Sequence, residues 1–248
     1  MLAAERRDLL LARLRTDGKV IAKELAAELG LSEDSVRRDL RELAAAGLCQ
    51  RVYGGALPVS PAIADYATRT AVSLDSKARV ARRAAELVRP GSTVILDGGT
   101  TALAVTKAFA PDLEATIVTH SPTVAAALVE HPSVEVFLIG GRLFKHSAVT
   151  SGAAAAEAAE RVQADLFLLG VTGVHPEAGL TTADPDEAAM KRLLSRRAAD
   201  TYVLASEEKI GAASPFEVLP WTAVAGVITD ADVDLPVPVL RAGKASTA

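Results

Sequence analysis

The sequence predicts two domains of different fold class: a small winged helix-turn-helix domain over residues 1–57, and an α/β domain with a mostly parallel central sheet over residues 75–235. Three observations predict this division. Apolar residues recur at helical spacing on both sides of a glycine turn near the N-terminus. After residue 75, short β-rich runs alternate with helical stretches. Between the two regions prolines interrupt the pattern, so residues 58–74 are predicted to be a linker.

The N-terminal domain is organised around the turn Gly30-Leu31-Ser32. A glycine can adopt the left-handed conformation that ends one helix, and Ser32 can cap the N-terminus of the next. Each helix then needs one apolar face toward a common core. The residues that repeat at this spacing are Val20, Leu25 and Leu29 before the turn, and Val36, Leu40 and Leu43 after it.

The second of these helices is predicted to read DNA. A helix that enters the major groove presents donors from its N-terminal half, and arginine makes bidentate contacts to guanine. An alternating run then ends at Gly54-Gly55, which is typical of a hairpin wing that reaches the DNA backbone or the minor groove. The alternative is an ordinary helical domain with solvated arginines. The residues predicted to contact DNA are Ser32, Ser35, Arg37, Arg38, Arg41, Arg51 and Tyr53.

Net charge supports DNA binding only locally. Residues 1–57 carry ten basic and nine acidic side chains, and the rest of the chain carries 17 basic and 22 acidic ones. The positive charge of the first domain is concentrated at residues 37–51. Because contacts to the phosphate backbone add up, two copies of such a small basic face would bind DNA better than one.

Composition indicates a cytoplasmic protein without a metal or cofactor. The 248 residues are half apolar, which is enough for a small domain and one full-sized core. We expect no targeting segment and no membrane span. Cys49 is the only cysteine, which excludes an intramolecular disulfide and a thiolate cluster, and the four histidines have no metal-ligand spacing. Residues 236–248 are predicted to be a tail.

The second domain is predicted to begin with a helix at residues 76–89 and to continue with alternating strands and helices. Ligands of open α/β sheets collect beyond the carboxyl ends of the strands. Five of the predicted strands end in residues rich in glycine or hydroxyl groups. The predicted strands are 93–96, 116–118, 134–139, 166–169, 201–204 and 224–228.

The sharpest of these strand ends is Asp97-Gly98-Gly99-Thr100-Thr101. Its glycines let a ligand approach the backbone, its hydroxyls can donate to oxyanions, and the helix that follows offers free N–H groups to a phosphate. We interpret it as a phosphate or carboxylate cradle, to which Lys209 could add a positive charge. The alternatives are plain helix capping and a solvated lysine.

Residues 184–191 are a second candidate for ligand binding. Asp184 can cap a helix, and Glu187 and Lys191 lie one turn apart on one face of it. One interpretation is a helix-surface salt bridge worth a few tenths of a kcal/mol. The other is that both side chains project into the pocket and bind sugar hydroxyls or a phosphate.

Several of these motifs resemble the DeoR-type transcriptional regulators. The N-terminal matches are Arg37-Arg38-Asp39-Leu40, Gly47-Leu48 and Gly54-Gly55-Ala56, although Tyr53 stands where many relatives have histidine. From residue 75 to about 232 the chain resembles the effector domain of the same family. The matches there are Asp97–Thr101, Gly140-Gly141, Gly179-Leu180-Thr181-Thr182, Glu187 with Lys191, and Lys209 with Gly211.

The resemblance implies a fold similar to ribose-5-phosphate isomerase and glucosamine-6-phosphate deaminase, with a phosphorylated sugar as effector. Relatives often have an acidic residue where Thr172 stands and an asparagine where His120 stands, and a threonine supplies no carboxylate. The residues predicted to bind the effector are Asp97, Gly98, Gly99, Thr100, Thr101, Thr119, His120, Ser121, Gly141, Thr172, Glu187, Lys191 and Lys209.

Two classes of function follow. The favoured one is a homo-oligomeric regulator, expected to be a repressor of carbohydrate metabolism genes, that leaves operator DNA when a sugar phosphate fills its pocket. The alternative is a sugar-phosphate isomerase-like enzyme with an appended DNA-binding domain. Isomerisation requires a positioned general base, for which Glu187 is the candidate, but no paired carboxylates stand near the cradle.

Overall fold

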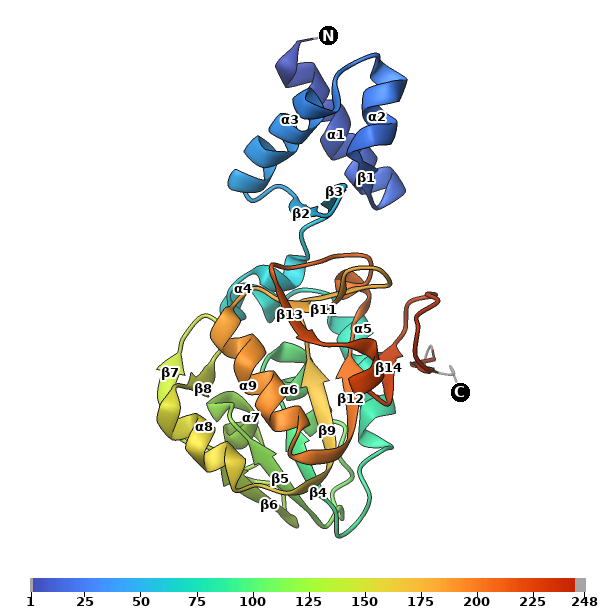
Figure 1. The fold of residues 1–248 in the computed structure, drawn as a ribbon. Coiled ribbons are helices and arrows are strands. Elements are labelled where there is room, and N and C mark those ends of the chain that lie inside the picture. The colour runs from blue at the N-terminus through green and yellow to red at the C-terminus, as the bar shows by residue number, and fades with distance from the viewer. Residues whose placement is uncertain (1, 244–248) are drawn as a thin grey trace.

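The structure, a computed structural model that describes residues 2–243, consists of a small N-terminal domain and a larger α/β domain (Figure 1). The N-terminal domain contains three helices and a three-stranded antiparallel sheet in the order β1-β3-β2. This is the winged helix-turn-helix that the sequence predicts. Its elements are α1 (Ala3–Asp17), β1 (Val20–Ile21), α2 (Ala22–Leu29), α3 (Glu33–Ala45), β2 (Gln50–Val52) and β3 (Gly55–Leu57).

Local chemistry places the turn between α2 and α3 where the sequence predicts it. Gly30 ends α2 with φ of 64°, a left-handed conformation that glycine adopts without strain. The Ser32 side chain accepts a hydrogen bond from the Ser35 N–H at 3.3 Å and so caps α3. A buried ion pair between Arg6 and Asp39 then joins α1 to α3. The apolar side chains of the three helices form a core of their own.

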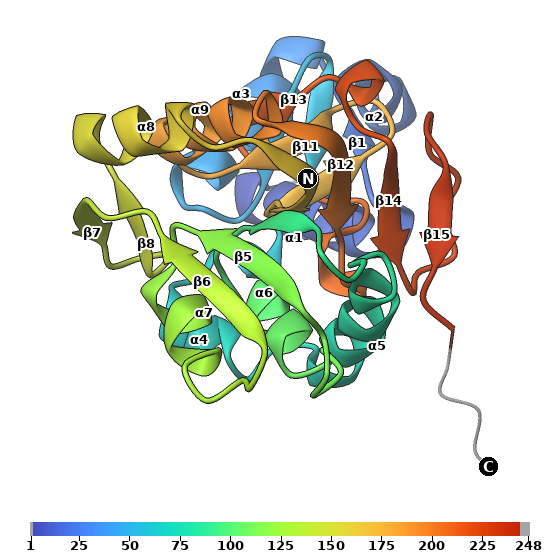
Figure 2. The same cartoon turned by 90° about the horizontal axis from the view of Figure 1, so that it is seen from below.

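The α/β domain is built on a seven-stranded parallel sheet in the order β15-β14-β12-β9-β4-β5-β6. Helices α5, α6 and α7 cover one face of this sheet and α8 and α9 cover the other (Figure 2). The strands are β4 (Thr93–Leu96), β5 (Ala115–Thr119), β6 (Val134–Leu138), β9 (Ala164–Gly170), β12 (Ala198–Leu204), β14 (Gly226–Thr229) and β15 (Val239–Arg241). The helices are α5 (Leu74–Ala85), α6 (Thr100–Thr106), α7 (Pro122–Ala127), α8 (Ala153–Glu160) and α9 (Pro185–Ser195).

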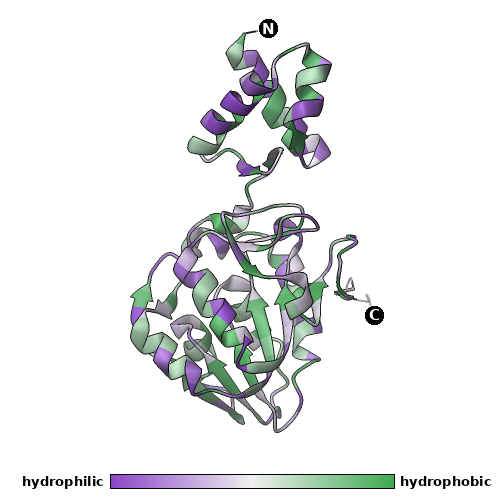
Figure 3. Ribbon diagram, in the orientation of Figure 1, coloured by the Kyte–Doolittle hydropathy of each residue, from purple (hydrophilic) through white to green (hydrophobic). Residues whose placement is uncertain are grey.

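The central strands are apolar on both faces because helices bury both sides. Along β9, Phe167 and Leu169 pack in the core under α8 and α9, whereas Leu166 and Leu168 pack in the core under α5 to α7. Figure 3 shows these strands as hydrophobic ribbons inside the domain, while the exposed side of α3 is hydrophilic. The alternation of a fully buried strand therefore divides the domain into two apolar layers.

Two smaller sheets lie at the carboxyl ends of the parallel strands or beside them. One is the hairpin of β7 (Arg142–Phe144) and β8 (Val149–Ser151). The other is antiparallel, in the order β10-β11-β13, and is made by β10 (Gly173–His175), β11 (Gly179–Thr182) and β13 (Phe216–Leu219). No helix within residues 2–243 is long and apolar enough to cross a membrane.

Residues 58–74, predicted to be a linker, are instead packed against the α/β domain. They contain the 3-10 turn η1 (Pro61–Ile63) and the short helix α4 (Tyr66–Arg69). Val59 forms a β-bridge with Ala213, and the N–H of Tyr66 donates to the His146 carbonyl at 2.8 Å. Of the two prolines that suggested a linker, Pro61 begins the turn η1, and Pro58 lies between β3 and the bridge at Val59.

The predicted tail is also partly wrong. Residues 239–241 form β15, which pairs with β14 in parallel, and Ala242 is buried in the core under α5. Three-residue strands leave too short a pattern to be identified by alternation. The last part of the predicted tail, residues 244–248, lies outside the described residues.

Candidate functional site

The strand order creates a ligand pocket beside β4. The chain passes from β4 to β5 and β6 on one side, and then returns through β9 to β12 on the other side. The connections that follow β4 and β9 therefore leave in opposite directions from the neighbouring Gly98 and Gly170, and such a switch point is where ligands of open α/β sheets bind. The residues that line the pocket include Arg69, Lys77, Gly98, Gly99, Thr100, Thr101, His146, Ser147, Gly170, Thr172, Thr182, Glu187, Lys191, Glu208 and Lys209.

Asp97 lies directly beneath this pocket and is fully buried. Its carboxylate accepts hydrogen bonds from the Lys191 ammonium at 2.6 Å, the Gly170 N–H at 2.8 Å and His120 Nε2 at 2.8 Å. Burial opposes ionisation of Asp97, but the charge of Lys191 and the hydrogen bond from His120 outweigh it and hold its pKa well below the ordinary value. Asp97 is therefore a charged support that fixes the ends of β4, β5 and β9 and the side chain of Lys191.

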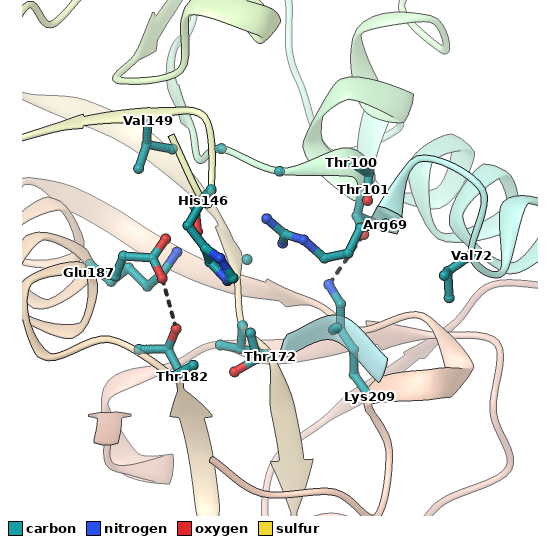
Figure 4. A pocket seen from close by; sticks show the side chains of 18 of the residues that line it. Arg69, Val72, Thr100, Thr101, His146, Val149, Thr172, Thr182, Glu187 and Lys209 are labelled. Atoms are coloured by element: carbon teal, nitrogen blue, oxygen red, sulfur yellow. Dashed lines mark hydrogen bonds between the residues drawn. The ribbon is translucent and has the colours of Figure 1, made fainter. Parts of the chain in front are cut away.

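Arg69 is the one cation of the pocket whose buried donors have no partner among the described residues. Its Nε and Nη2 atoms are buried without a hydrogen bond. The guanidinium points into the pocket beside His146 (Figure 4), and Nη1 lies 3.6 Å from the position that a Cβ atom at Gly99 would occupy. Burial lowers the pKa of Arg69, and the charge of Glu187 is the largest effect that opposes this change. A buried guanidinium with unpaired donors is suited to bind an anion that accepts hydrogen bonds from them.

Lys209 adds a second positive charge on the same side. Its ammonium donates to Thr101 Oγ1 at 3.2 Å and to the Leu204 carbonyl at 3.2 Å. Burial lowers its pKa to about 8. Since this ammonium touches the hydroxyl of the glycine-threonine loop, an anion bound there would meet both groups at once.

Lys77 has a different role. Its ammonium donates to the Arg69 carbonyl at 2.8 Å and to the Val72 carbonyl at 2.5 Å. It thus donates to two carbonyls of the segment from Arg69 to Val72 and fixes the backbone from which Arg69 projects.

The pocket is nearly closed in this structure. Its free volume is about 40 Å³, whereas small-molecule sites typically hold about 300 Å³ or more. Arg69 and His146 extend into the space between the walls (Figure 4). A ligand of the size of a sugar phosphate would therefore have to displace these side chains, or the segment that holds Arg69, in order to enter.

Most of the predicted effector residues meet at this pocket, but five do not line it. Asp97 lies beneath it and acts through Lys191. The Glu187–Lys191 surface salt bridge does not form, because Lys191 pairs with Asp97 and Glu187 accepts from the Thr182 hydroxyl at 3.3 Å. The other four residues away from the pocket are Thr119, His120, Ser121 and Gly141, which lie at or just after the carboxyl ends of β5 and β6.

Each of these four has a local structural partner. His120 bridges Asp97 and the Thr150 carbonyl, and Thr119 Oγ1 accepts from the Ser121 N–H at 3.1 Å. The Ser121 hydroxyl caps α7, while Gly141 packs against Ala155. Strand ends alone could not separate these residues from the pocket, because the order of the strands decides which ends converge.

Arg69, Lys77, His146 and Glu208 line the pocket but were not predicted. Arg69 and His146 come from segments without a helical or strand pattern, and these segments are joined through the His146 carbonyl and Nε2. No local pattern in the sequence separates Arg69 from the other cations of this stretch, and Lys77 lies on the buried face of α5.

The predicted DNA-contacting residues remain on the outside of the N-terminal domain. Arg38, Arg41 and Arg51 are exposed, and Tyr53 at the tip of the β2–β3 hairpin is fully exposed. Arg37 is also exposed but pairs with Glu33 one turn earlier at 2.7 Å. Recognition helix and wing thus present cations that are available to phosphates and base edges.

Comparison with known families matches a family model to each of the two domains. The DeoR-like helix-turn-helix domain matches residues 6–62, and the DeoR C terminal sensor domain matches residues 72–231. The chain belongs to the DeoR family. It is therefore a DNA-binding transcriptional regulator with a sensor domain, and the pocket lies inside that sensor domain.

Relatives in the DeoR family match almost the whole chain. The HTH-type transcriptional regulator GlpR of Haloferax volcanii is 35% identical over 94% of this chain and 92% of its own length. The glycerol-3-phosphate regulon repressor of Escherichia coli is 30% identical over 97% of this chain and 95% of its own length. Both are named as regulators, and both span the two domains.

Solved structures resemble this chain more distantly. Ribose 5-phosphate isomerase A from Methanocaldococcus jannaschii has a TM-score of 0.39 and 15% identity, and covers 54% of this chain and 53% of its own. The translation initiation factor eIF-2B from Pyrococcus horikoshii has a TM-score of 0.46 and 15% identity, and the similarity covers 65% of each chain.

Proposed function

We propose that this chain is a repressor of carbohydrate metabolism genes, which binds operator DNA as a homo-oligomer and is released from it by a phosphorylated sugar bound beside β4. The observation that carries the proposal is the buried guanidinium of Arg69, whose Nε and Nη2 have no partner among residues 2–243. Leaving such donors buried destabilises the fold unless a ligand accepts from them. A phosphate has the charge and the several acceptor oxygens that they require.

The phosphate would bind between Arg69, Lys209 and the loop from Gly98 to Thr101. Lys209 already contacts the Thr101 hydroxyl, and Gly98 has no room for a side chain, because a Cβ atom there would lie 2.2 Å from Val149. The sugar would extend toward Glu187 and Thr182, which carry acceptors and donors suited to hydroxyl groups. Thr172, at the same wall, is engaged with Ser214 Oγ at 2.9 Å.

Binding of the effector would reach the DNA-binding domain through the segment that carries Arg69. This segment begins directly after strand β3 of the wing and runs through η1 to α4. Because the pocket is nearly closed, a ligand that moves Arg69 would also move α4. Effector binding would thus change the position of the two recognition helices of a dimer, whose spacing must fit successive major grooves. A coupling of about 1–3 kcal/mol would weaken operator binding about 5- to 150-fold.

The first experiment is thermal denaturation of the full chain with a panel of sugar phosphates, each tested beside its unphosphorylated parent. A ligand that binds the folded state raises the melting temperature. The proposal expects a rise for some phosphates and for none of the parents, and loss of that rise in Arg69→Met. A second step selects an operator from random DNA and measures its affinity with and without the active phosphate. Unchanged operator affinity would refute release by that effector.

We also propose that the pocket binds its ligand without converting it. The relatives that match the whole chain are named as regulators. Glu187, the candidate general base, accepts a hydrogen bond from Thr182 and interacts with the positive charge of Arg69. A carboxylate in this environment is suited to binding hydroxyl groups. The purified chain incubated with each phosphate that stabilises it should return that compound unchanged by NMR. An isomerised product that disappears in Glu187→Gln would establish an enzyme instead.

A further inference from the structure

The edge strand β6 is unusually exposed for the rim of a sheet. Its residues Val136, Phe137 and Leu138 are 37%, 51% and 45% exposed, so apolar side chains are open on both faces. The opposite edge, β15, has three residues, follows Pro236 and Pro238 and ends in an exposed arginine. Prolines, charges and short length are the usual protection of an edge against pairing. β15 has this protection and β6 does not.

Most of the outer backbone groups of β6 are also free to pair. The N–H of Ile139 donates to the Thr119 carbonyl at 2.8 Å, so Ile139 faces β5. Because successive residues of a strand alternate, Glu135 and Phe137 also direct their peptide groups toward β5, and Val134, Val136 and Leu138 direct theirs away from the sheet. β6 is the last strand of the sheet, so within residues 2–243 these groups have no strand partner, although the N–H of Val134 donates to His131 Nδ1 at 3.2 Å.

A shallow apolar groove continues this edge along α7. The side chains of Val136 and Leu138 line it together with Ala125, Ala126 and Val129. Val129 is 78% exposed, which is high for a valine beside a sheet. Backbone, edge side chains and helix thus make one continuous uncovered surface.

We propose that β6 pairs in antiparallel fashion with β6 of a second copy, about a two-fold axis at Val136. In this register Val136 lies opposite Val136 of the partner subunit, and Val134 lies opposite the partner subunit's Leu138. The N–H groups of Val136 and Leu138 then donate to the carbonyls of the partner subunit's Val136 and the partner subunit's Val134, and the side chains of the strand extend the apolar groove across the axis.

Charge favours the same register. Centred on Val136, each Glu135 lies opposite a phenylalanine, whereas a shift of the axis to Glu135 would place two carboxylates directly opposite, which is destabilising. A shift to Phe137 would leave Val134 unpaired. The antiparallel arrangement also brings the amino end of one strand, which follows the exposed Glu130, to the carboxyl end of the other, which precedes the exposed Arg142. The surface is therefore complementary to itself.

This interface would join regulators rather than place two recognition helices on one operator. The N-terminal domain lies at the end of the α/β domain toward which the parallel strands point (Figure 1). Antiparallel pairing of β6 therefore directs the two N-terminal domains to opposite ends of the assembly. Pairing of β6 with a second copy would therefore connect two operator-bound units in a higher oligomer. This consequence rests on the operator-binding dimer proposed above.

Cysteine cross-linking tests the interface and its register in the full chain. Opposed residues of a hydrogen-bonded pair have Cα atoms about 5.5 Å apart, within disulfide range. Val136→Cys should give a covalent dimer on mild oxidation, and Leu138→Cys should not, because its symmetry mate is four residues away along the ladder. The double variant Val134→Cys/Leu138→Cys should cross-link again. The native Cys49 is buried, so the unmodified chain is the control that should not cross-link. Equal cross-linking of Val136→Cys and Leu138→Cys, or of neither, would overturn the proposal.

Light scattering measures the consequence for assembly. Val136→Lys should halve the particle mass relative to the unmodified chain, whereas Phe216→Lys, a control of the same 37% exposure on β13, should leave it unchanged. Val136→Lys should also keep its affinity for one selected operator but lose the capture of a second labelled operator on immobilised DNA. An unchanged mass in a folded Val136→Lys variant would refute the interface. If Val136→Lys is folded, has half the mass and has lost single-operator binding, the interface stands but its separation from the operator dimer is wrong.

Discussion

The arginines of α3 and the arginine of α4 are the same side chain in opposite environments. Arg38 and Arg41 are exposed on the recognition helix, where water solvates them until DNA replaces it. Arg69 is mostly removed from water and has two donors without a partner in the described chain. The exposed cations add affinity for any polyanion in proportion to their number and to the salt. The buried one is held at a loss of stability, which only a specific anion offsets.

The largest loss of stability is expected from removal of the carboxylate beneath the pocket, because it leaves a second buried cation without a partner. Asp97→Ala should lower the free energy of unfolding by about 3–5 kcal/mol, because Lys191 would remain buried without its partner. Urea denaturation measures the change. The exposed Asp112→Ala should change stability by less than about 0.5 kcal/mol. If Asp97→Ala/Lys191→Met is no more stable than Asp97→Ala, an unpaired charge is the wrong explanation.

Replacing the buried guanidinium should move stability and ligand affinity in opposite directions. Arg69→Met should raise the melting temperature of the free chain, because it removes the unpaired buried donors. It should weaken binding of the active phosphate about 10- to 100-fold, which corresponds to the roughly 1.5–3 kcal/mol of a hydrogen bond to a charged group. Calorimetry and thermal denaturation measure the two effects, with Arg82→Met on the exposed face of α5 as control. A lower melting temperature for free Arg69→Met would show that Arg69 stabilises the fold by itself.

Replacement of an exposed arginine of α3 should change DNA binding alone. Arg38→Ala should weaken operator binding about tenfold and leave the melting temperature and phosphate binding unchanged. Arg37→Ala should have a smaller effect, since Glu33 already holds that guanidinium. Fluorescence anisotropy over a range of salt concentrations measures both. Equal operator affinity for Arg38→Ala and the unmodified chain would remove Arg38 from the contact surface.

The smallest expected effect is a pH dependence of ligand binding. The pKa of Lys209 is about 8, so the free chain holds this proton at pH 7 and loses it as the pH rises through 8. If the anion binds the protonated form, its affinity should fall about fourfold between pH 7 and pH 8.5. Lys209→Met should bind more weakly at pH 7 but show no such fall in titrations at the two pH values. A fall of the same size in Lys209→Met would assign the titration to another group.

The sequence predicted the DNA-binding domain in more detail than the pocket, for a physical reason. The turn at Gly30 and the cap at Ser32 depend on neighbours within a few residues, so a local pattern identifies them. The pocket depends on which strand ends lie together. Its residues near Asp97 and Lys209 were predicted from their own motifs. Thr119 and His120 were wrongly included among the pocket residues, because local periodicity does not reveal the order of the strands. Arg69 was missed because a four-residue helix carries no repeat.

The position of the join between the two domains determines where this regulator can be cut and recombined. The N-terminal domain has a core of its own, and Val59 and Ser60 are the first residues of the connecting segment that engage the sensor domain, through Ala213 and the Glu208 carbonyl. A chimaera should therefore exchange the DNA-reading head before Val59 and retain everything after it. Such a hybrid would respond to the same effector at a different promoter, so a regulator of this build can acquire new target genes without a change in its sensor domain.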